Sequence, residues 1–244
     1  MLGRFIASPI EDSLTAAVFS HLLHLPVGMF WEILRRACYS DQLPQHPGSL
    51  LGVVPWPSWS SKGTLNADRV VPDLFIRFSD FDLIIEAKRW DVGMQDLAQW
   101  QRELLAYANE YGGGGKPVRL LAVGGLWDTR DTEVFPAGEE LKSGVLAPGH
   151  QPPAIRCPVH MVKWSRILAE CRRLERKLFY AESPTEQDAA HGRILAHICD
   201  LMAAHGYSTG RWFADLDFSS HRLNADVTSH LRLFIAYSKR LTAR

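Results

Sequence analysis

The chain has 244 residues, of which 46% are hydrophobic and 22% charged, and its formal net charge is zero. This length and composition suit one substantial domain, or a core domain with a smaller appendage. The neutral charge excludes a strongly basic, free-standing DNA-binding protein, although a neutral protein can still carry one basic face. No apolar run approaches the roughly 20 residues that span a bilayer, so we expect no membrane association and a cytoplasmic protein.

Four cysteines are scattered along the chain at positions Cys38, Cys157, Cys171 and Cys199. They form no C-x-x-C pair, which argues against a zinc ribbon or an iron–sulfur cluster. We therefore predict reduced thiols in the core.

The first helix is predicted from its start signal. Ser8 is a good N-cap, Pro9 suits the first helical position, and Glu11 three residues after the cap completes a capping box. Apolar residues then recur at helical spacing as far as Leu25. A second helix is expected over residues 28–39.

The middle of the chain is expected to contain most of the strands. Residues 70–78 and 81–90 are rich in β-forming residues and are separated only by Ser79-Asp80, which predicts a hairpin. The nearly continuous apolar run 118–126 is typical of a strand buried on both faces. The other expected elements are a strand near 51–56, a helix over 94–110, a loop over 127–154, a strand over 155–163 and helices to about residue 205, broken near Ser183-Pro184.

This order of elements predicts an α/β fold in which helices flank a central mixed β-sheet. We expect a core over residues 1–165 and a C-terminal helical extension over residues 166–244 that packs on the core. The extension ends in a last apolar stretch over residues 231–237.

Three polar residues interrupt the two apolar strands of the hairpin. Pro72-Asp73 is followed, after twelve intervening positions, by Glu86-Ala87-Lys88. Glu86 and Lys88 lie two residues apart on one strand and therefore point to the same face, and the turn folds Asp73 back toward Glu86. Carboxylates hold hard cations such as Mg²⁺, and a nearby lysine can orient or deprotonate an attacking water. Hydrolysis of a phosphodiester needs this combination.

The pattern Pro72-Asp73 … Glu86-Ala87-Lys88, on consecutive strands with a helix before and after, resembles the signature of the PD-(D/E)XK nuclease superfamily. That superfamily includes restriction endonucleases and RecB-type nuclease domains, and the resemblance covers residues 1 to about 126. It implies a restriction-endonuclease-like core with catalytic Asp73, Glu86 and Lys88. The alternative is an ion-pair cluster on a half-exposed sheet, although such clusters seldom lie inside runs as apolar as residues 83–85.

The resemblance also implies a Mg²⁺ site, at which Mn²⁺ could substitute. Asp73 and Glu86 would hold the metal together with Ala87 and with Glu11, since an acidic residue on the first helix often completes such sites. A capping role explains Glu11 equally well, and the two roles are compatible.

Gln101 is a further candidate for the catalytic site. It lies in the middle of the stripe of apolar residues predicted to be buried on the helix after Lys88, and a buried amide needs partners. RecB-type relatives carry Gln-x-x-x-Tyr on this helix, but position 105 here is Leu. A core glutamine with structural partners is the alternative.

A basic stripe is expected on the helix that follows Lys163. Arg166, Arg173 and Lys177 lie opposite its apolar face, where they could contact phosphates or simply face solvent.

Together these features predict a Mg²⁺-dependent deoxyribonuclease. The resemblance implies that it leaves 5′-phosphates, and analogy with that class suggests bacterial restriction, anti-phage defence or DNA processing. The alternative is a catalytically silent nucleic-acid-binding or assembly subunit on the same fold. RNA as substrate and a homo-oligomer both stay open. The sequence has no helicase, methyltransferase or P-loop motif, so a partner protein would have to supply any ATPase or recognition function.

Overall fold

The centre of the protein is a six-stranded sheet with the strand order β1-β2-β3-β4-β6-β5. The structure is a computed structural model, and it describes residues 11–65, 68–134, 145–151, 153 and 155–207. The strands are β1 (Leu50–Pro55), β2 (Leu74–Phe78), β3 (Asp82–Ala87), β4 (Val118–Val123), β5 (Thr132–Glu133) and β6 (Pro158–Val162). The helices are α1 (Glu11–Leu22), α2 (Val27–Ala37), α3 (Leu97–Tyr111), α4 (Trp164–Phe179) and α5 (Glu186–Ala204), and a 3₁₀ turn, η2 (Gly112–Gly114), follows α3.

The sheet is mixed, as the order of elements predicts. Strands β1, β2 and β3 pair antiparallel, β3, β4 and β6 pair parallel, and the short edge strand β5 pairs antiparallel with β6. The α/β class is therefore confirmed. The expected helices and strands are present between residues 11 and 207, whereas β5 lies in a segment that we expected to be a loop.

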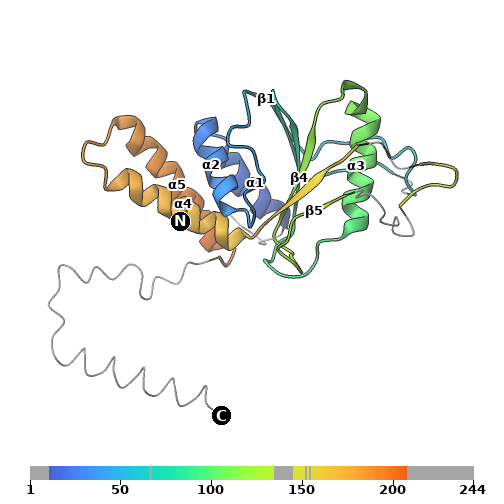
Figure 1. Cartoon of the computed structure of the whole chain (residues 1–244). Coiled ribbons are helices and arrows are strands. Elements are labelled where there is room, and N and C mark those ends of the chain that lie inside the picture. Colours follow the sequence, from blue (N-terminus) through green and yellow to red (C-terminus); the bar gives the residue numbers. More distant parts are fainter. Residues whose placement is uncertain (1–10, 66–67, 135–144, 152, 154, 208–244) are drawn as a thin grey trace, which may run out of the picture. The chain divides into compact units, whose positions relative to one another are not determined.

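Helices cover both faces of the sheet (Figure 1). Helix α3 packs on one face, where its side chains join a cluster with Phe75, Ile84 and Leu120. Helices α1, α2, α4 and α5 contribute to the cluster on the other face, which also contains Leu83 and Ile85. Neighbouring residues of β3 thus point into different clusters, which explains why its sequence is apolar without interruption.

The two C-terminal helices of the described part belong to the main core. Helices α4 and α5 share one hydrophobic cluster with α1, α2 and the sheet. The expected boundary between residues 165 and 166 falls inside α4. Residues 208–244, including the apolar stretch 231–237, and the N-terminal cap at Ser8 and Pro9 lie outside the described residues. The extension over residues 166–244 therefore stays a prediction.

The basic stripe of α4 faces a neighbouring helix. Arg166 donates from Nε to the carbonyl oxygen of Ala37 at 2.6 Å, and from Nη2 to that of Cys38 at 3.0 Å, so it caps the C-terminus of α2. Arg173 donates to Glu32 of α2 at 2.9 Å and also to Glu170. These two arginines of the expected stripe are held by intramolecular contacts, so the stripe is not a purely solvated face, and its contact with phosphates stays a prediction.

The four cysteines all lie in the described residues, where each is buried and none forms a disulfide. Burial raises the pKa of Cys38 to about 12, which keeps its thiol protonated. Among the described helices, none has both the length and the apolar character that crossing a membrane requires.

Candidate active site

The candidate site lies where β2 begins and β3 ends. In the register of this hairpin Leu74 lies opposite Ile85, so the residues next to them, Asp73 and Glu86, come together at the same end. The side chain of Asp73 accepts a hydrogen bond at Oδ2 from the main-chain nitrogen of Ala87, at 2.7 Å. The hairpin therefore brings the first carboxylate of the motif against the Glu86-Ala87 segment, as its turn predicts.

Glu86 is a buried carboxylate with two side-chain donors. Only 2% of the residue is exposed. Its Oε1 accepts hydrogen bonds from Lys88 Nζ and, at 2.7 Å, from Gln99 Nε2 of α3. Glu86 and Lys88 thus share one face of the strand, and the two donors fix the position of the carboxylate.

A third acidic side chain, Glu103 of α3, lies beside these two carboxylates. It is 1% exposed. Burial raises the pKa of Glu103 well above its usual value, the charges of Glu86 and Asp73 raise it further, and Lys88 lowers it. The site therefore concentrates acidic groups in a place from which water is largely excluded. Such an arrangement disfavours ionisation of Glu103 unless a cation is bound among the three groups.

Sequence reasoning missed Gln99 and Glu103, which form the wall of the site on α3. They are four residues apart and therefore share one face of the helix. Just before the helix, Gln95 donates from Nε2 to the carbonyl oxygens of Glu86 at 3.0 Å and Gly124 at 3.2 Å. Its own Oε1 accepts from Trp100 Nε1 at 2.8 Å. These hydrogen bonds of the Gln95 side chain connect the end of β3 to the start of α3.

Gln101 lies on a different side of α3 from Gln99. The two residues are about 200° apart around the helix. Gln101 is buried, but within the described part of the chain its Oε1 has no hydrogen-bond partner. The amide that reaches Glu86 belongs to Gln99 instead, so the expected role of Gln101 stays a prediction without a contact to support it. The side chain of Glu11, the first residue of α1, lies outside the described residues, and both of its roles stay predictions.

Two consecutive glycines hold the main chain close to Lys88. Gly124 and Gly125 follow β4 with φ values of +66° and +62°. A Cβ atom on Gly124 would lie 2.4 Å from the carbonyl oxygen of Lys88, and one on Gly125 would lie 2.7 Å from Lys88 Cβ. That same carbonyl accepts from Trp164 Nε1 at 2.8 Å. Only glycine fits at both positions, and a Gly-Gly pair directly after a buried strand is a signal that the sequence offered.

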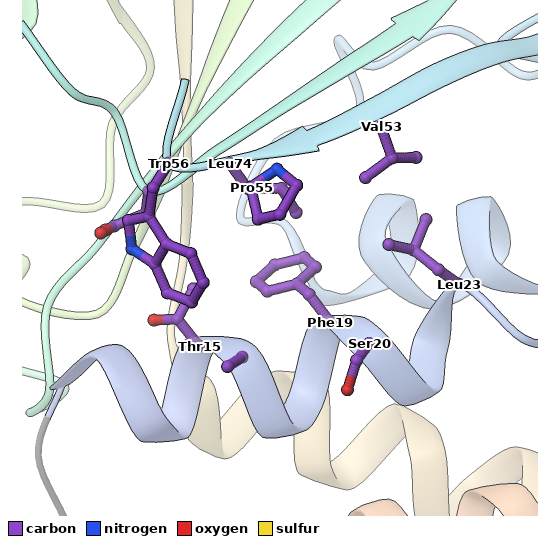
Figure 2. A pocket seen from close by; sticks show the side chains of 10 residues that line it. Thr15, Phe19, Ser20, Leu23, Val53, Pro55, Trp56 and Leu74 are labelled. Carbon is purple, nitrogen blue, oxygen red and sulfur yellow. The ribbon is translucent and has the colours of Figure 1, made fainter. Parts of the chain in front are cut away.

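An apolar cavity of about 200 Å³ adjoins Asp73 on the side of α1 and β1 (Figure 2). Trp56 forms part of its wall at the end of β1 and has a φ of +44°, a conformation that only a small fraction of non-glycine residues adopt. The main-chain nitrogen of Trp56 donates to the carbonyl oxygen of Asp73 at 3.0 Å. The turn at Trp56 thus anchors the main chain that carries the first carboxylate.

The donor set fits a hard cation in its chemistry. Asp73 and Glu86 offer carboxylate oxygens, the type of ligand that Mg²⁺ prefers, and Ala87 lies between them and Lys88. The raised pKa of Glu103 marks a surplus of negative charge that a divalent cation would relieve. Side chains of His, Cys, Asp and Glu form no ready-made group of three or more for a metal in the described ranges, which do not include the side chain of Glu11.

Comparison with known proteins identifies a similar protein, but the function of that protein is not described. No family model and no solved structure matches the chain. The chain is similar to an uncharacterized protein of Pasteurella multocida (strain Pm70), with 26% identity over 210 residues that cover 84% of this chain and 74% of that protein. The functional argument therefore rests on the site.

Proposed function

We propose that this protein is a Mg²⁺-dependent nuclease of the PD-(D/E)XK superfamily, with a restriction-endonuclease-like core, that hydrolyses DNA phosphodiester bonds. The observation that carries the proposal is the convergence of Asp73, Glu86 and Lys88 at one end of the β2–β3 hairpin. Asp73 contacts the main chain beside Glu86, and Lys88 contacts the carboxylate of Glu86. The activity belongs, on this proposal, to bacterial restriction, anti-phage defence or DNA processing.

In this mechanism the two strand carboxylates would hold the metal. Asp73 and Glu86 would be its ligands together with Ala87, and Glu103 adds a third acidic group beside them, which a bound cation would help to ionise. Bound Mg²⁺ would neutralise charge on the phosphate and make a bound water more acidic.

Lys88 provides the positive charge next to these carboxylates. Its side chain is 12% exposed, so its ammonium group lies in a partly dry environment where its charge acts strongly. The glycines after β4 and the hydrogen bond from Trp164 fix its main chain. Lys88 is thus able to orient an attacking water and to stabilise charge that develops on the phosphate.

Gln99 and Gln95 are positioning residues in this scheme. Gln99 holds the side chain of Glu86, and Gln95 holds its carbonyl group. Fixing a ligand from two sides keeps the carboxylate in one orientation, which metal sites need.

The alternative, a silent binding or assembly subunit, explains this electrostatic arrangement less well. A protein that only binds has no use for Glu103 buried beside Glu86 and Asp73, because this crowding of acidic groups destabilises the fold. Ionisable groups whose pKa is shifted by burial and by like charges cluster at catalytic sites.

Cleavage of supercoiled plasmid DNA with Mg²⁺ or Mn²⁺ tests the proposal. We expect wild type to nick or linearise the plasmid, and chelation to abolish the reaction. Lys88→Ala should lower the rate by roughly 100-fold or more, the usual loss when one charge-stabilising donor is removed. Lys62→Ala, at an exposed lysine of the loop between β1 and β2, is the matched control and should cleave normally.

A parallel reaction on RNA distinguishes the two nucleic acids. If folded wild-type protein cleaves neither DNA nor RNA with either metal, or if Lys88→Ala cleaves at the wild-type rate, the proposal is wrong.

A further inference from the structure

The loop between β3 and α3 exposes its apolar side chains and turns other residues inward. Trp90, Val92 and Met94 are 51%, 58% and 59% exposed. Asp91 and Gly93, which alternate with them, are half-buried. A loop that only faces water would expose its polar side chains and bury its apolar ones. Exposed apolar side chains that alternate with half-buried residues therefore indicate a contact surface.

A second loop extends this apolar surface. Trp127, which follows β4, is 79% exposed. Its ring lies against Gly93, because a Cβ atom on Gly93 would be 2.6 Å from Cη2 of Trp127. Trp127 thus lies against the loop that carries the other three exposed side chains, and we call the four the tryptophan surface: Trp90, Val92, Met94 and Trp127.

The two loops are held rigidly together. The main-chain nitrogens of Gly125 and Leu126 donate to the carbonyl oxygens of Trp90 and Asp91, at 2.5 and 3.1 Å, and that of Met94 donates to Gly125 at 3.0 Å. The carboxylate of Asp91 also accepts from the first main-chain nitrogen of α4 at 2.7 Å. These bonds stop the tryptophans from collapsing onto the core, so the surface is organised before any partner arrives.

Along the chain, the tryptophan surface directly follows the candidate active site. The chain passes from Lys88 to Trp90 in two residues, and the guanidinium of Arg89 lies 4.5 Å from the centre of the Trp90 ring. A cavity of about 460 Å³ extends from Trp127 to Gln95 and is also lined by Arg130 and Asp128. Gln95 is the residue that holds the carbonyl group of Glu86.

We propose that the tryptophan surface stacks unpaired bases of a single nucleic-acid strand whose backbone enters the site at Lys88. An indole face stacks on any base, which suits binding without sequence preference, and an arginine beside it attracts the backbone. A closed duplex hides its base faces and offers mainly phosphates, which call for a basic surface rather than an apolar one. The inference rests on the proposed nuclease function and names its substrate class as single-stranded or locally unwound.

The proposal is tested by the binding of full-length protein to a short labelled single strand and to the duplex of the same sequence. Chelator is present throughout, so nothing is cleaved and metal-site chemistry does not enter. We expect wild type to prefer the single strand. Trp127→Ala should weaken single-strand binding by about 5- to 150-fold, the range for loss of one stacked base. Phe179→Ala, at a 76% exposed aromatic residue of α4, is the matched control and should bind normally.

Two conservative variants distinguish stacking from general apolar contact. Trp127→Phe keeps an aromatic face and should retain most of the affinity, whereas Trp127→Leu keeps apolar bulk without that face and should not. Equal binding by the Phe and Leu variants would mean apolar docking, as of a protein partner, and would contradict the proposal. The same strand made of ribonucleotides shows whether the strand is DNA or RNA.

Several outcomes overturn the inference. Wild type that binds neither single strand, wild type that prefers the duplex, or Trp127→Ala that binds like wild type would each refute it. If wild type cleaves plasmid but Trp127→Ala binds the single strand normally, only this inference is refuted and the proposed function stands. Stacking without any cleavage would instead remove the proposed function.

Discussion

The two ends of β3 each carry a buried carboxylate on the same face of the sheet, yet their surroundings are opposite. At the first end, Asp82 is 1% exposed and accepts from Lys116 Nζ at 2.8 Å and from the hydroxyl of Tyr107 at 3.1 Å. At the other end, Glu86 is 2% exposed and lies beside a second buried acid, Glu103.

This contrast separates a structural carboxylate from a candidate functional one. Asp82 is balanced by a neighbouring cation, so its burial ties β3 to α3 with little electrostatic strain. Glu86 has Lys88 as a donor, but the charge of that lysine also acts on Glu103, the second buried acid beside it. Asp82 and Glu86 are only four residues apart on β3, yet the first carboxylate stabilises the fold and the second strains it. The following predictions test this difference from the largest expected effect to the smallest.

Glu86→Gln should lower metal-dependent cleavage by about 1,000-fold or more while the thermal midpoint stays unchanged or rises. The amide removes one ligand charge but keeps the size of the side chain, and the lost stabilisation of the reacting phosphate corresponds to several kcal/mol. Single-turnover cleavage and thermal melting measure the two effects. A variant that melts much earlier than wild type would show that Glu86 is structural like Asp82.

Asp82→Ala should have the opposite outcome. It removes the carboxylate that balances the charge of Lys116 and accepts from the hydroxyl of Tyr107, so we expect a loss of about 3 kcal/mol and a midpoint lower by roughly 6–12 °C. Cleavage per folded molecule should stay normal at low temperature. The exposed turn residue Asp80 provides the control, and Asp80→Ala should change stability by no more than about 0.5 kcal/mol. Cleavage that falls without a loss of stability would contradict the comparison.

Glu103→Gln should stabilise the metal-free protein by roughly 1–2 kcal/mol at neutral pH, because it removes a buried acid from beside two others. The folded state binds the proton of Glu103 more tightly than the unfolded state does. The stability that this proton provides is therefore complete below the usual pKa of 4.5 and is lost as pH rises through the raised folded value.

Denaturant melts at several pH values check the sign of this effect. The advantage of Glu103→Gln over wild type should grow as pH rises, and Mg²⁺ should stabilise wild type more than the variant. An advantage that is constant across pH would mean that the pKa of Glu103 is not raised in the folded protein.

Tyr107→Phe should have the smallest effect, a loss of about 0.5–1 kcal/mol, because it removes one neutral donor from Asp82 and leaves Lys116 in place. Denaturant unfolding of the variant, with Tyr111→Phe as control for a ring that stacks on Tyr107, measures it. A much larger loss would mean that Asp82 depends on the hydroxyl more than on the lysine.

The strand-borne part of the site was predictable because it depends on local geometry. A two-residue period fixes the common face of Glu86 and Lys88, and a tight turn fixes the return of the chain toward Asp73. The same local signals predicted the hairpin and most of the helices. Strand β5 was missed because its two residues, Thr132 and Glu133, are held by pairing with β6 rather than by their own sequence.

The helix-borne part was not predictable from a single apolar stripe. Helix α3 is buried on two sides, against the sheet through Leu104 and Tyr107, and under the segment of Val145 through Ala98 and Leu105. A periodicity argument assumes one buried side, so it singled out Gln101 and passed over Glu103. Likewise, a basic stripe on α4 cannot reveal that α2 accepts its hydrogen bonds, because that contact depends on tertiary packing.

Mutations at Gly124 and Gly125 should inactivate this protein without changing any side chain that takes part in the reaction. Neither carries a side chain that could take part in a reaction, yet any larger residue would press on the main chain or the Cβ of Lys88. In a random-mutagenesis screen for inactive protein that still accumulates in cells, we expect substitutions at this pair to recur beside those at Asp73, Glu86 and Lys88. The positions found in such a screen should thus include two glycines that have no reactive side chain.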